Sequence, residues 1–447
     1  MPRLLAILFI LFLISCHSAG NKKNHNPGKD IGIQNKTFTT VIGIYFLNKD
    51  SFTSNQFQVL ASQMIPEFKL MDSIPGEISS NVYAINYYKH PLRDFTPPDS
   101  DALNTFGRGL SATEIADAQK SRTAIALQFA GTREHVADLQ QRINTLVAAV
   151  TKNKHVLIVD ESTFESFNHE SWTELRVENF QGENKDITGQ VIIHMYREDE
   201  FCRVVTLGME KFCLPDISIK NISCNDQNSY ANLVNAIIQT VFEDPFIHGD
   251  SSLPVDLTRI KNSRVKDYLS LDIKKQAKKR VTVHLKYAEP EDGDNLNPQL
   301  RLDFSNPEYS SPQEEQMAAI DQLFGAEDSI VRTEHDTELL AVSEKAREHL
   351  PALRELFNKG LQPGFSLLLK LPFKTYNGGR EWMWVEVTKW KNESITGILE
   401  NDPFEVKNLK AGAIVKGEQK DVFDYVLSKP DGTEEGNETG KILERRK

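Results

Sequence analysis

The chain has 447 residues with a formal net charge of −11, and 39% of its residues are hydrophobic. This composition is typical of a folded globular protein, and the negative charge argues against nucleic acid as a partner. The length suggests about three domains. We expect an α+β, multidomain fold, in which two α/β-type sandwich regions precede a helix and a small β-rich C-terminal domain.

The first residues, MPRLLAILFILFLISC, are typical of a secretory signal. Arg3 provides a basic start, and residues 4–14 form an apolar run that is too short to span a bilayer comfortably. The run ends in Leu13-Ile14-Ser15-Cys16, which resembles the bacterial lipobox. This resemblance implies that residues 1–15 are removed and that Cys16 is lipidated. An uncleaved membrane anchor and a secreted protein that is cleaved elsewhere remain alternatives.

Residues 16–36 are rich in Asn, Gly and Lys and show no apolar periodicity, so we expect a flexible tether. No later apolar run reaches the length of a transmembrane helix. We therefore expect acylated Cys16 to hold the protein at the cell membrane or the outer membrane, with the domains facing the periplasm. The membrane is the first expected partner, a protein partner is a second hypothesis, and no nucleic acid is expected.

An α/β-type domain is predicted for residues 37–165. Residues 38–47 are typical of a buried strand, because β-branched and aromatic residues fill a short apolar run. A helix is predicted over 132–152, and a strand at 155–160 follows it directly, which is typical of a sandwich layer. Apolar residues lie three and four positions apart on one face of this helix: Val136, Leu139, Ile143, Leu146, Val147 and Val150.

A second domain, of α+β type, is predicted for residues 166–290. Its helices are expected at 226–242 and 264–279, and its strands at 189–196, 201–207, 216–220 and 281–287. Beyond Cys16 the chain carries three cysteines, Cys202, Cys213 and Cys224. An odd number leaves at least one thiol unpaired, so one disulfide and three buried free thiols both stay open. Their even spacing fits no familiar zinc pattern, and we expect no metal and no cofactor.

Residues 291–335 are expected to form a linker and a helix. Pro298 and Pro307 stand among acidic residues without periodicity, which is typical of a loop. The acidic residues around Glu291 and Asp294 depart from the calcium-loop pattern, so we expect a solvated loop there. The boundary of the last domain is placed near 325–335.

The last domain is predicted for residues 336–447. It begins with a helix whose apolar face carries Ala346, Leu350, Leu353 and Phe357. The motifs that follow are FSLLLK at 365–370, NGG at 377–379, EWMWV at 381–385, GIL at 397–399, NDP at 401–403, LKAG at 409–412 and DY at 424–425. Their order and spacing resemble the small bacterial domain DUF2314, a domain of unknown function. Tyr425 stands where that family usually has tryptophan.

The simplest interpretation of these motifs is that they specify the fold of a β-rich domain. The functional alternative is a ligand or partner surface, since aromatic side chains beside carboxylates are good recognition groups. Its candidate residues are Glu381, Trp382, Trp384, Asn401 and Asp402.

The chain contains none of the common nucleotide-binding, serine-hydrolase or metalloprotease motifs, and we assign no catalytic residue. Our first hypothesis is a non-enzymatic, membrane-tethered binding lipoprotein of the cell envelope. A second is an envelope hydrolase whose acid and base come from separate segments, among Glu381, Asp402 and Asp424. A third is an immunity or toxin-neutralising lipoprotein.

Overall fold

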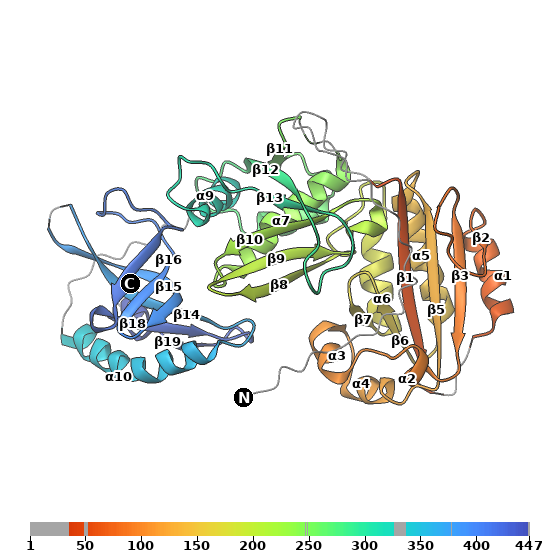
Figure 1. The fold of residues 1–447 in the computed structure, drawn as a ribbon, viewed down its shortest axis with the longest axis horizontal. Helices are drawn as coiled ribbons and strands as arrows, with labels where there is room; N and C mark the ends of the chain where they lie inside the picture. The colour runs from red at the N-terminus through yellow and green to blue at the C-terminus, as the bar shows by residue number, and fades with distance from the viewer. Residues whose placement is uncertain are drawn as a thin grey trace.

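The computed structural model describes residues 35–48, 52–245, 247, 249–325, 337–376 and 378–445. Three β-sheets with their helices lie in a row along the long axis of the molecule (Figure 1). The predicted α+β, multidomain fold is confirmed, including the C-terminal helix and small β-rich region. The signal, Cys16 and almost all of the tether lie outside the described residues. Among the described helices, none is long and apolar enough to span a bilayer.

The N-terminal sheet has seven strands in the order β2-β3-β5-β1-β6-β7-β4. Its central strand β1 (Thr37–Phe46) pairs antiparallel with β5 (Thr123–Thr132) and β6 (Val156–Asp160). The other strands are β2 (Lys69–Leu70), β3 (Val82–Tyr88), β4 (Gly107–Arg108) and β7 (Glu165–Phe167).

Helices cover both faces of this sheet, as expected for a sandwich. α1 (Ser54–Met64) and α5 (Val136–Thr151) share one apolar cluster, in which the predicted face of α5 is buried. The opposite face packs against α2 (Pro91–Asp94), α3 (Ser100–Phe106) and α4 (Ala112–Ala118). The next segment, which leads to the middle sheet, contains α6 (His169–Trp172), the π-helix η1 (Thr173–Val177) and η2 (Glu178–Phe180).

The middle sheet has six strands in the order β11-β12-β13-β10-β9-β8. Its strands are β8 (Ile192–Glu198), β9 (Phe201–Leu207), β10 (Asp216–Ile222), β11 (Ser252–Asp256), β12 (Arg280–Ala288) and β13 (Gln299–Leu302). Its helical elements are η3 (Met209–Phe212), α7 (Gln227–Glu243), α8 (Ser263–Ser270) and α9 (Pro312–Phe324). α7 and α9 contribute to its apolar core.

Three expectations for this region are wrong. β13 lies inside the predicted linker and pairs parallel with β10, because four residues among prolines are too few to show periodicity. α8 ends at Ser270 rather than 279, since Gln276 and Lys279 have positive φ values that no α-helix contains. The acidic loop is not simply solvated, because the buried carboxylate of Asp294 lies 2.6 Å from Arg203.

One disulfide is present, which decides between the alternatives for the cysteines. Cys202, in β9, is bonded to Cys224, in the turn after β10, and these two strands are neighbours in the sheet. Cys213 is a buried free thiol, and burial raises its pKa to about 12.

The C-terminal sheet has six antiparallel strands in the order β17-β16-β15-β14-β18-β19. They are β14 (Ser366–Lys374), β15 (Arg380–Lys391), β16 (Ser394–Leu399), β17 (Ile414–Glu418), β18 (Asp424–Ser428) and β19 (Glu434–Gly436), with η4 (Gln419–Asp421) between β17 and β18. α10 (Thr337–Lys359) buries the predicted Ala346, Leu350 and Leu353 against one sheet face. The chain then ends with α11 (Glu438–Arg445). The predicted domain boundaries stay predictions, and most of the stretch 325–335 lies outside the described residues.

Candidate functional site

Glu381 lies half-buried at the start of β15, and its carboxylate binds the backbone of a neighbouring loop. Its Oε1 accepts a hydrogen bond from the amide of Phe404 and its Oε2 accepts one from Glu405, both at 2.8 Å. The amide of Tyr376 also donates to the carbonyl oxygen of Glu405, at 3.1 Å. Glu381 therefore joins the β14–β15 hairpin to the loop that follows β16.

Asn401 and Asp402 belong to that same loop. Asp402 is exposed, and its Oδ1 accepts a hydrogen bond from the amide of Ala411 at 2.9 Å. Asn401 precedes it and is half-buried. Short polar side chains that bind a nearby amide are typical of loop formation. Asp402, one of the predicted site residues, thus connects the start of the loop to its end at Ala411.

The two predicted tryptophans have different surroundings. Trp382 lies with its ring centroid 4.6 Å from that of Phe423, in an apolar cluster that also holds residues of α10 and α11. Trp384 follows two residues later on the same face of β15. It is half-buried, and the ammonium of Lys370 lies 5.2 Å from its ring centroid, a cation–π distance. Trp382 therefore packs against residues of α10 and α11, while Trp384 contacts the ammonium of Lys370.

Asp424 is buried in β18 and anchors the last helix. Its Oδ2 accepts hydrogen bonds from the amide and the hydroxyl of Thr439, at 2.8 Å and 2.6 Å. The strand register places Trp384, Lys370 and Asp424 in one row across β15, β14 and β18. Burial lowers the pKa of Lys370, and the negative charge of Asp424 opposes this change.

The three carboxylates of the hydrolase hypothesis are therefore each bonded to a different piece of backbone. Glu381 binds the amides of residues 404 and 405, Asp402 binds that of residue 411, and Asp424 binds the start of α11. An acid and base pair needs oxygens that can reach one substrate. The hydrogen bonds of these carboxylates in the described part of the chain go to separate backbone amides and not to a shared partner.

The loops held by Glu381 display two aromatic side chains that the sequence did not suggest. Tyr376 is 64% exposed and Phe404 is 57% exposed. The ammonium of Lys407 lies 5.3 Å from the ring centroid of Tyr376. We call Tyr376, Phe404 and Lys407 the aromatic tip. Its sequence signal is an aromatic residue directly beside each turn motif, NGG and NDP, where polar residues are usual.

The comparison with known families agrees with the motifs that this sheet carries. Residues 336–445 match the DUF2314 family. Its description is "uncharacterized protein conserved in bacteria", and the match spans about a quarter of the chain. The predicted resemblance of this C-terminal region is confirmed, and we call it the DUF2314 domain. No curated protein and no solved structure matches the chain.

One motif of the DUF2314 domain contacts the middle domain. Gly412 has a φ of 84°, and a side chain there would begin 2.4 Å from the backbone oxygen of Gln313 in α9. The hydroxyl of Ser311 donates a hydrogen bond to the carbonyl oxygen of Gly412 at 3.0 Å. Only glycine accommodates both this φ and this close approach. The LKAG motif therefore allows the two domains to pack closely.

A small polar pocket of about 330 Å³ lies in the N-terminal domain, far along the chain from the DUF2314 domain. His169 lines it, with its Nδ1 atom 3.0 Å from the hydroxyl of Thr151. The other lining residues are Glu114, Asn153, Lys154, His155, Val156, Asn168 and Glu170. In the described part of the chain, no group of three His, Cys, Asp or Glu side chains could hold a metal ion.

Buried ion pairs connect the N-terminal domain to the segments that follow it. The ammonium of Lys211, in η3, lies 2.6 Å from Asp160, and Arg176 lies 2.7 Å from Glu165. Arg176 also lies 3.2 Å from Asp160, and Arg108 lies 2.7 Å from Glu165. Burial alone would raise the pKa of Asp160, but the charges of Lys211 and Arg176 hold this pKa below its usual value. Asp160, Arg176 and Lys211 serve the interface, because their charges are paired and buried.

Proposed function

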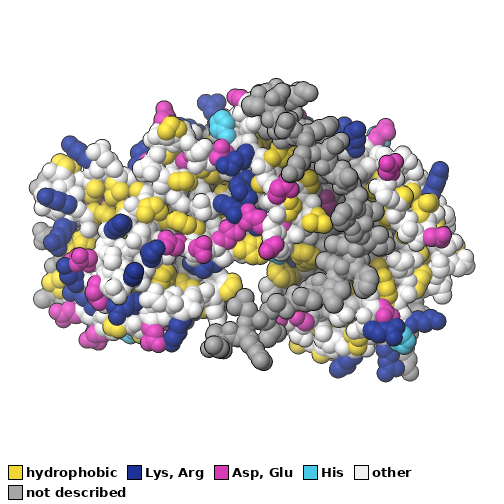
Figure 2. Space-filling model, in the orientation of Figure 1, with side chains coloured by type: hydrophobic (Ala, Val, Ile, Leu, Met, Phe, Trp, Pro, Cys, Tyr) yellow, Lys and Arg dark blue, Asp and Glu magenta, His cyan; other side chains and the backbone are white. Residues whose placement is uncertain are grey.

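We propose that the protein is a lipid-anchored binding protein of the bacterial cell envelope, whose aromatic tip contacts a protein partner. The observation that carries the proposal is the presentation of Tyr376 and Phe404 on two loops that Glu381 holds together. Aromatic side chains are enriched at protein interfaces, where they bury a large area at a small cost in conformational entropy. Figure 2 shows hydrophobic side chains on the surface of the C-terminal domain, among both basic and acidic ones.

Two features support the envelope location. The lipobox-like ending at Cys16 supports a lipid anchor, and residues 16–36 supply a tether. The disulfide between Cys202 and Cys224 supports an oxidising compartment, since such bonds are rare in the cytosol. Both features fit export followed by acylation.

We base no catalytic proposal on Glu381, Asp402 and Asp424, because their oxygens accept hydrogen bonds from backbone amides. A toxin-neutralising role would be one form of the proposed binding function. It would place the toxin on the aromatic tip, and it is covered by the same experiment.

The test is capture from solubilised envelope fractions with a soluble form of residues 30–447, which retains all three sheets. The double variant Tyr376→Ser/Phe404→Ser removes the aromatic tip. The double variant Tyr268→Ser/Leu271→Ser is the matched control, because these side chains are 51% and 82% exposed on the middle domain. We expect one partner to be retained by the unmodified form and the control and lost from the tip variant. Capture that the tip variant leaves unchanged, or no specific capture, would overturn the proposal.

A further inference from the structure

Two glutamates of the DUF2314 domain face the middle domain from one face of the C-terminal sheet. Glu386 lies in β15 and is 2% exposed. Glu400 directly follows β16, and its amide donates a hydrogen bond to the carbonyl oxygen of Trp384. Because Glu386 and Trp384 are two residues apart on β15, this register places both glutamate side chains on the same face. That face meets residues 223–226, the turn that follows β10.

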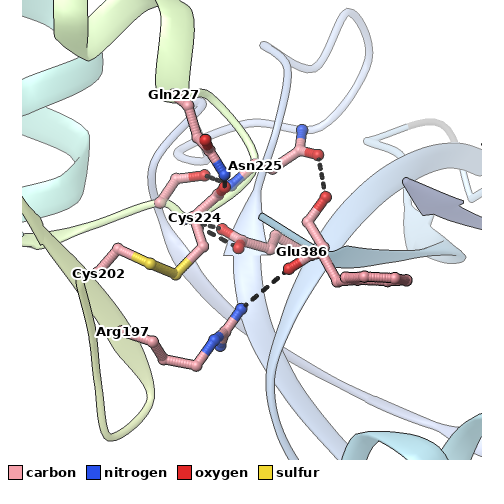
Figure 3. Close-up of a disulfide and its surroundings, with 9 residues drawn as sticks. Arg197, Cys202, Cys224, Asn225, Gln227 and Glu386 are labelled. Carbon is pink, nitrogen blue, oxygen red and sulfur yellow. Dashed lines mark hydrogen bonds between the residues drawn. A yellow bond between two sulfur atoms is a disulfide. The ribbon is translucent and has the colours of Figure 1, made fainter. Parts of the chain in front are cut away.

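Both carboxyl groups are held by this turn, as Figure 3 shows for Glu386. The amide of Cys224 donates hydrogen bonds to both oxygens of Glu386, at 2.9 Å and 3.1 Å. The side-chain amide of Asn225 donates to Oε2 of Glu400 at 2.8 Å, and its oxygen accepts a hydrogen bond from Ser366 at 2.7 Å. The DUF2314 domain is thus docked on a turn that the disulfide ties to β9.

The charges around the two glutamates are mostly negative. Arg197, on β8, is the cation that faces Glu386, and it also donates to the carbonyl oxygen of Phe365. Glu400 has acidic neighbours in Glu386 and in Asp226, which precedes α7. Its Oε1 atom is buried without a hydrogen-bond partner among the described residues. A buried carboxylate in that position is unfavourable unless it takes up a proton.

Tyr230 on α7 faces the pair, and Asp321 on α9 lies near Asp226 of the same turn. Tyr230, on α7, is fully buried, and burial raises its pKa well above the usual value. Asp321, on α9, has its pKa raised to about 6 by burial and by the charges of Asp402 and Asp226, with Lys274 opposing. The interface therefore gathers acids from both domains around the turn 223–226.

We infer that Glu386 and Glu400 form a pH-sensitive latch, which holds the DUF2314 domain on the middle domain while the pair carries a proton and loosens it when both carboxyls are ionised. This regulation goes beyond the proposed binding function and does not depend on it. The latch sets the position of the aromatic tip relative to the rest of the chain.

The direction of the response follows from the protonation of the docked state. Burial raises the pKa of Glu386 to about 7, and burial together with the charge of Glu386 raises the pKa of Glu400 well above its usual value. The docked state therefore binds more protons than the undocked state. Docking is most favourable below the usual carboxyl pKa and weakens as the pH rises through about 7.

Other contacts across the same interface differ in their dependence on pH. Lys389 pairs with Glu200 at 2.5 Å, but both side chains are exposed, and exposed ion pairs contribute little to stability because solvent screens them. The hydrogen bond from Ser311 to the carbonyl oxygen of Gly412 involves no titratable group. Asp321 has a raised pKa, so it should weaken docking in the same direction as the latch when the pH rises.

The test is hydrogen exchange of peptides that cover 221–230 and 382–402 in the detergent-purified full-length protein, corrected for the intrinsic effect of pH. We expect protection to fall at least about tenfold between pH 6 and pH 8.5, which corresponds to about 1.4 kcal/mol of docking free energy. Small-angle scattering of the same samples should show a larger maximum dimension at pH 8.5. No expansion and unchanged protection in the unmodified protein would overturn the latch.

Variants identify the groups responsible. Glu386→Gln/Glu400→Gln keeps an acceptor at each position but cannot ionise, so its protection should stay at the pH 6 level at both pH values. Glu434→Gln, at an exposed position in β19, is the matched control and should behave as the unmodified protein does. A double variant that keeps the full pH dependence would contradict the assignment. Partner capture is not part of this readout, so the latch and the binding proposal can fail separately.

Discussion

The two domain interfaces of this protein bury acidic side chains in opposite surroundings. Between the N-terminal and middle domains, Asp160 and Glu165 lie against lysine and arginine side chains at ion-pair distance. Between the middle and DUF2314 domains, Glu386 and Glu400 meet backbone and side-chain amides and each other, and Arg197 is the cation that faces Glu386. A buried acid paired closely with cations favours its charged form, whereas one for which burial outweighs the nearby positive charge favours its neutral form. Asp160 and Glu165 therefore favour ionisation and Glu386 and Glu400 favour protonation, as does the buried Glu210 beside Lys211 in the first interface.

The largest effect is expected from breaking the first interface. Lys211→Met removes the ammonium that lies 2.6 Å from Asp160 and leaves the buried carboxylate with Arg176 alone. We expect the free energy of unfolding to fall by about 3 kcal/mol, the lower end of the usual cost of breaking a buried ion pair, because Arg176 still faces Asp160. Denaturant unfolding at pH 7 measures this loss.

The matched control is Lys389→Met, which breaks the exposed pair with Glu200 in the second interface. Its expected cost is about 0–1 kcal/mol, because an exposed ion pair contributes little. Equal losses from the two lysine variants would contradict the expected difference between the buried ion pair of the first interface and the exposed pair of the second.

The next effect is on the pH dependence of stability. We expect one loss of stability at acid pH and another at alkaline pH, each of about 1–3 kcal/mol. Burial alone would raise the pKa of Glu165, but Arg176 and Arg108 lower it, as Lys211 and Arg176 lower that of Asp160. The stability that Asp160 and Glu165 contribute to the first interface should therefore be lost as the pH falls below about 4. The second should lose stability as the pH rises through about 7, the pKa of Glu386.

Thermal unfolding and hydrogen exchange between pH 3 and pH 9 would separate the acid loss of stability from the alkaline loss. The variant Glu386→Gln/Glu400→Gln should reduce the alkaline loss and leave the acid loss unchanged. Loss of both pH-dependent changes in that variant would disagree with this account.

The smallest effect is expected within the DUF2314 domain, at the loops that carry the aromatic tip. Glu381→Ala removes the acceptor for the amides of Phe404 and Glu405. We expect a loss of about 1 kcal/mol and faster exchange of these two amides. Asp431→Ala, which removes a similar contact to Thr433 in an exposed turn, is the control. Unchanged exchange at residues 404 and 405 would show that Glu381 does not hold the loop.

Periodic segments could be predicted from the sequence, because their apolar faces repeat. The faces of α5 and α10 are buried where the spacing of their leucines and isoleucines placed them. β13 was missed because four residues carry too few repeats, and its pairing with β10 is a long-range contact. The length of α8 was overestimated because helical spacing alone cannot show the positive φ of Gln276.

The candidate site was predictable only in part. The motif residues Glu381 and Asp402 were found, yet their partners are amides of a loop whose path the sequence does not reveal. Glu386 lies on the face of β15 that also carries Trp382 and Trp384, and a lone glutamate there is usually expected to be exposed. Its burial depends on the docking of another domain, and no pattern within the strand carries that information.

The disulfide between Cys202 and Cys224 connects the docking of the DUF2314 domain to the oxidation of the chain. The turn that receives Glu386 is tied to β9 through this bond, so its shape depends on oxidation. In a reducing environment this covalent link between the turn and β9 is absent. Under the proposed export, the final joining of the DUF2314 domain would take place after translocation, which would couple maturation of the protein to its arrival in the envelope.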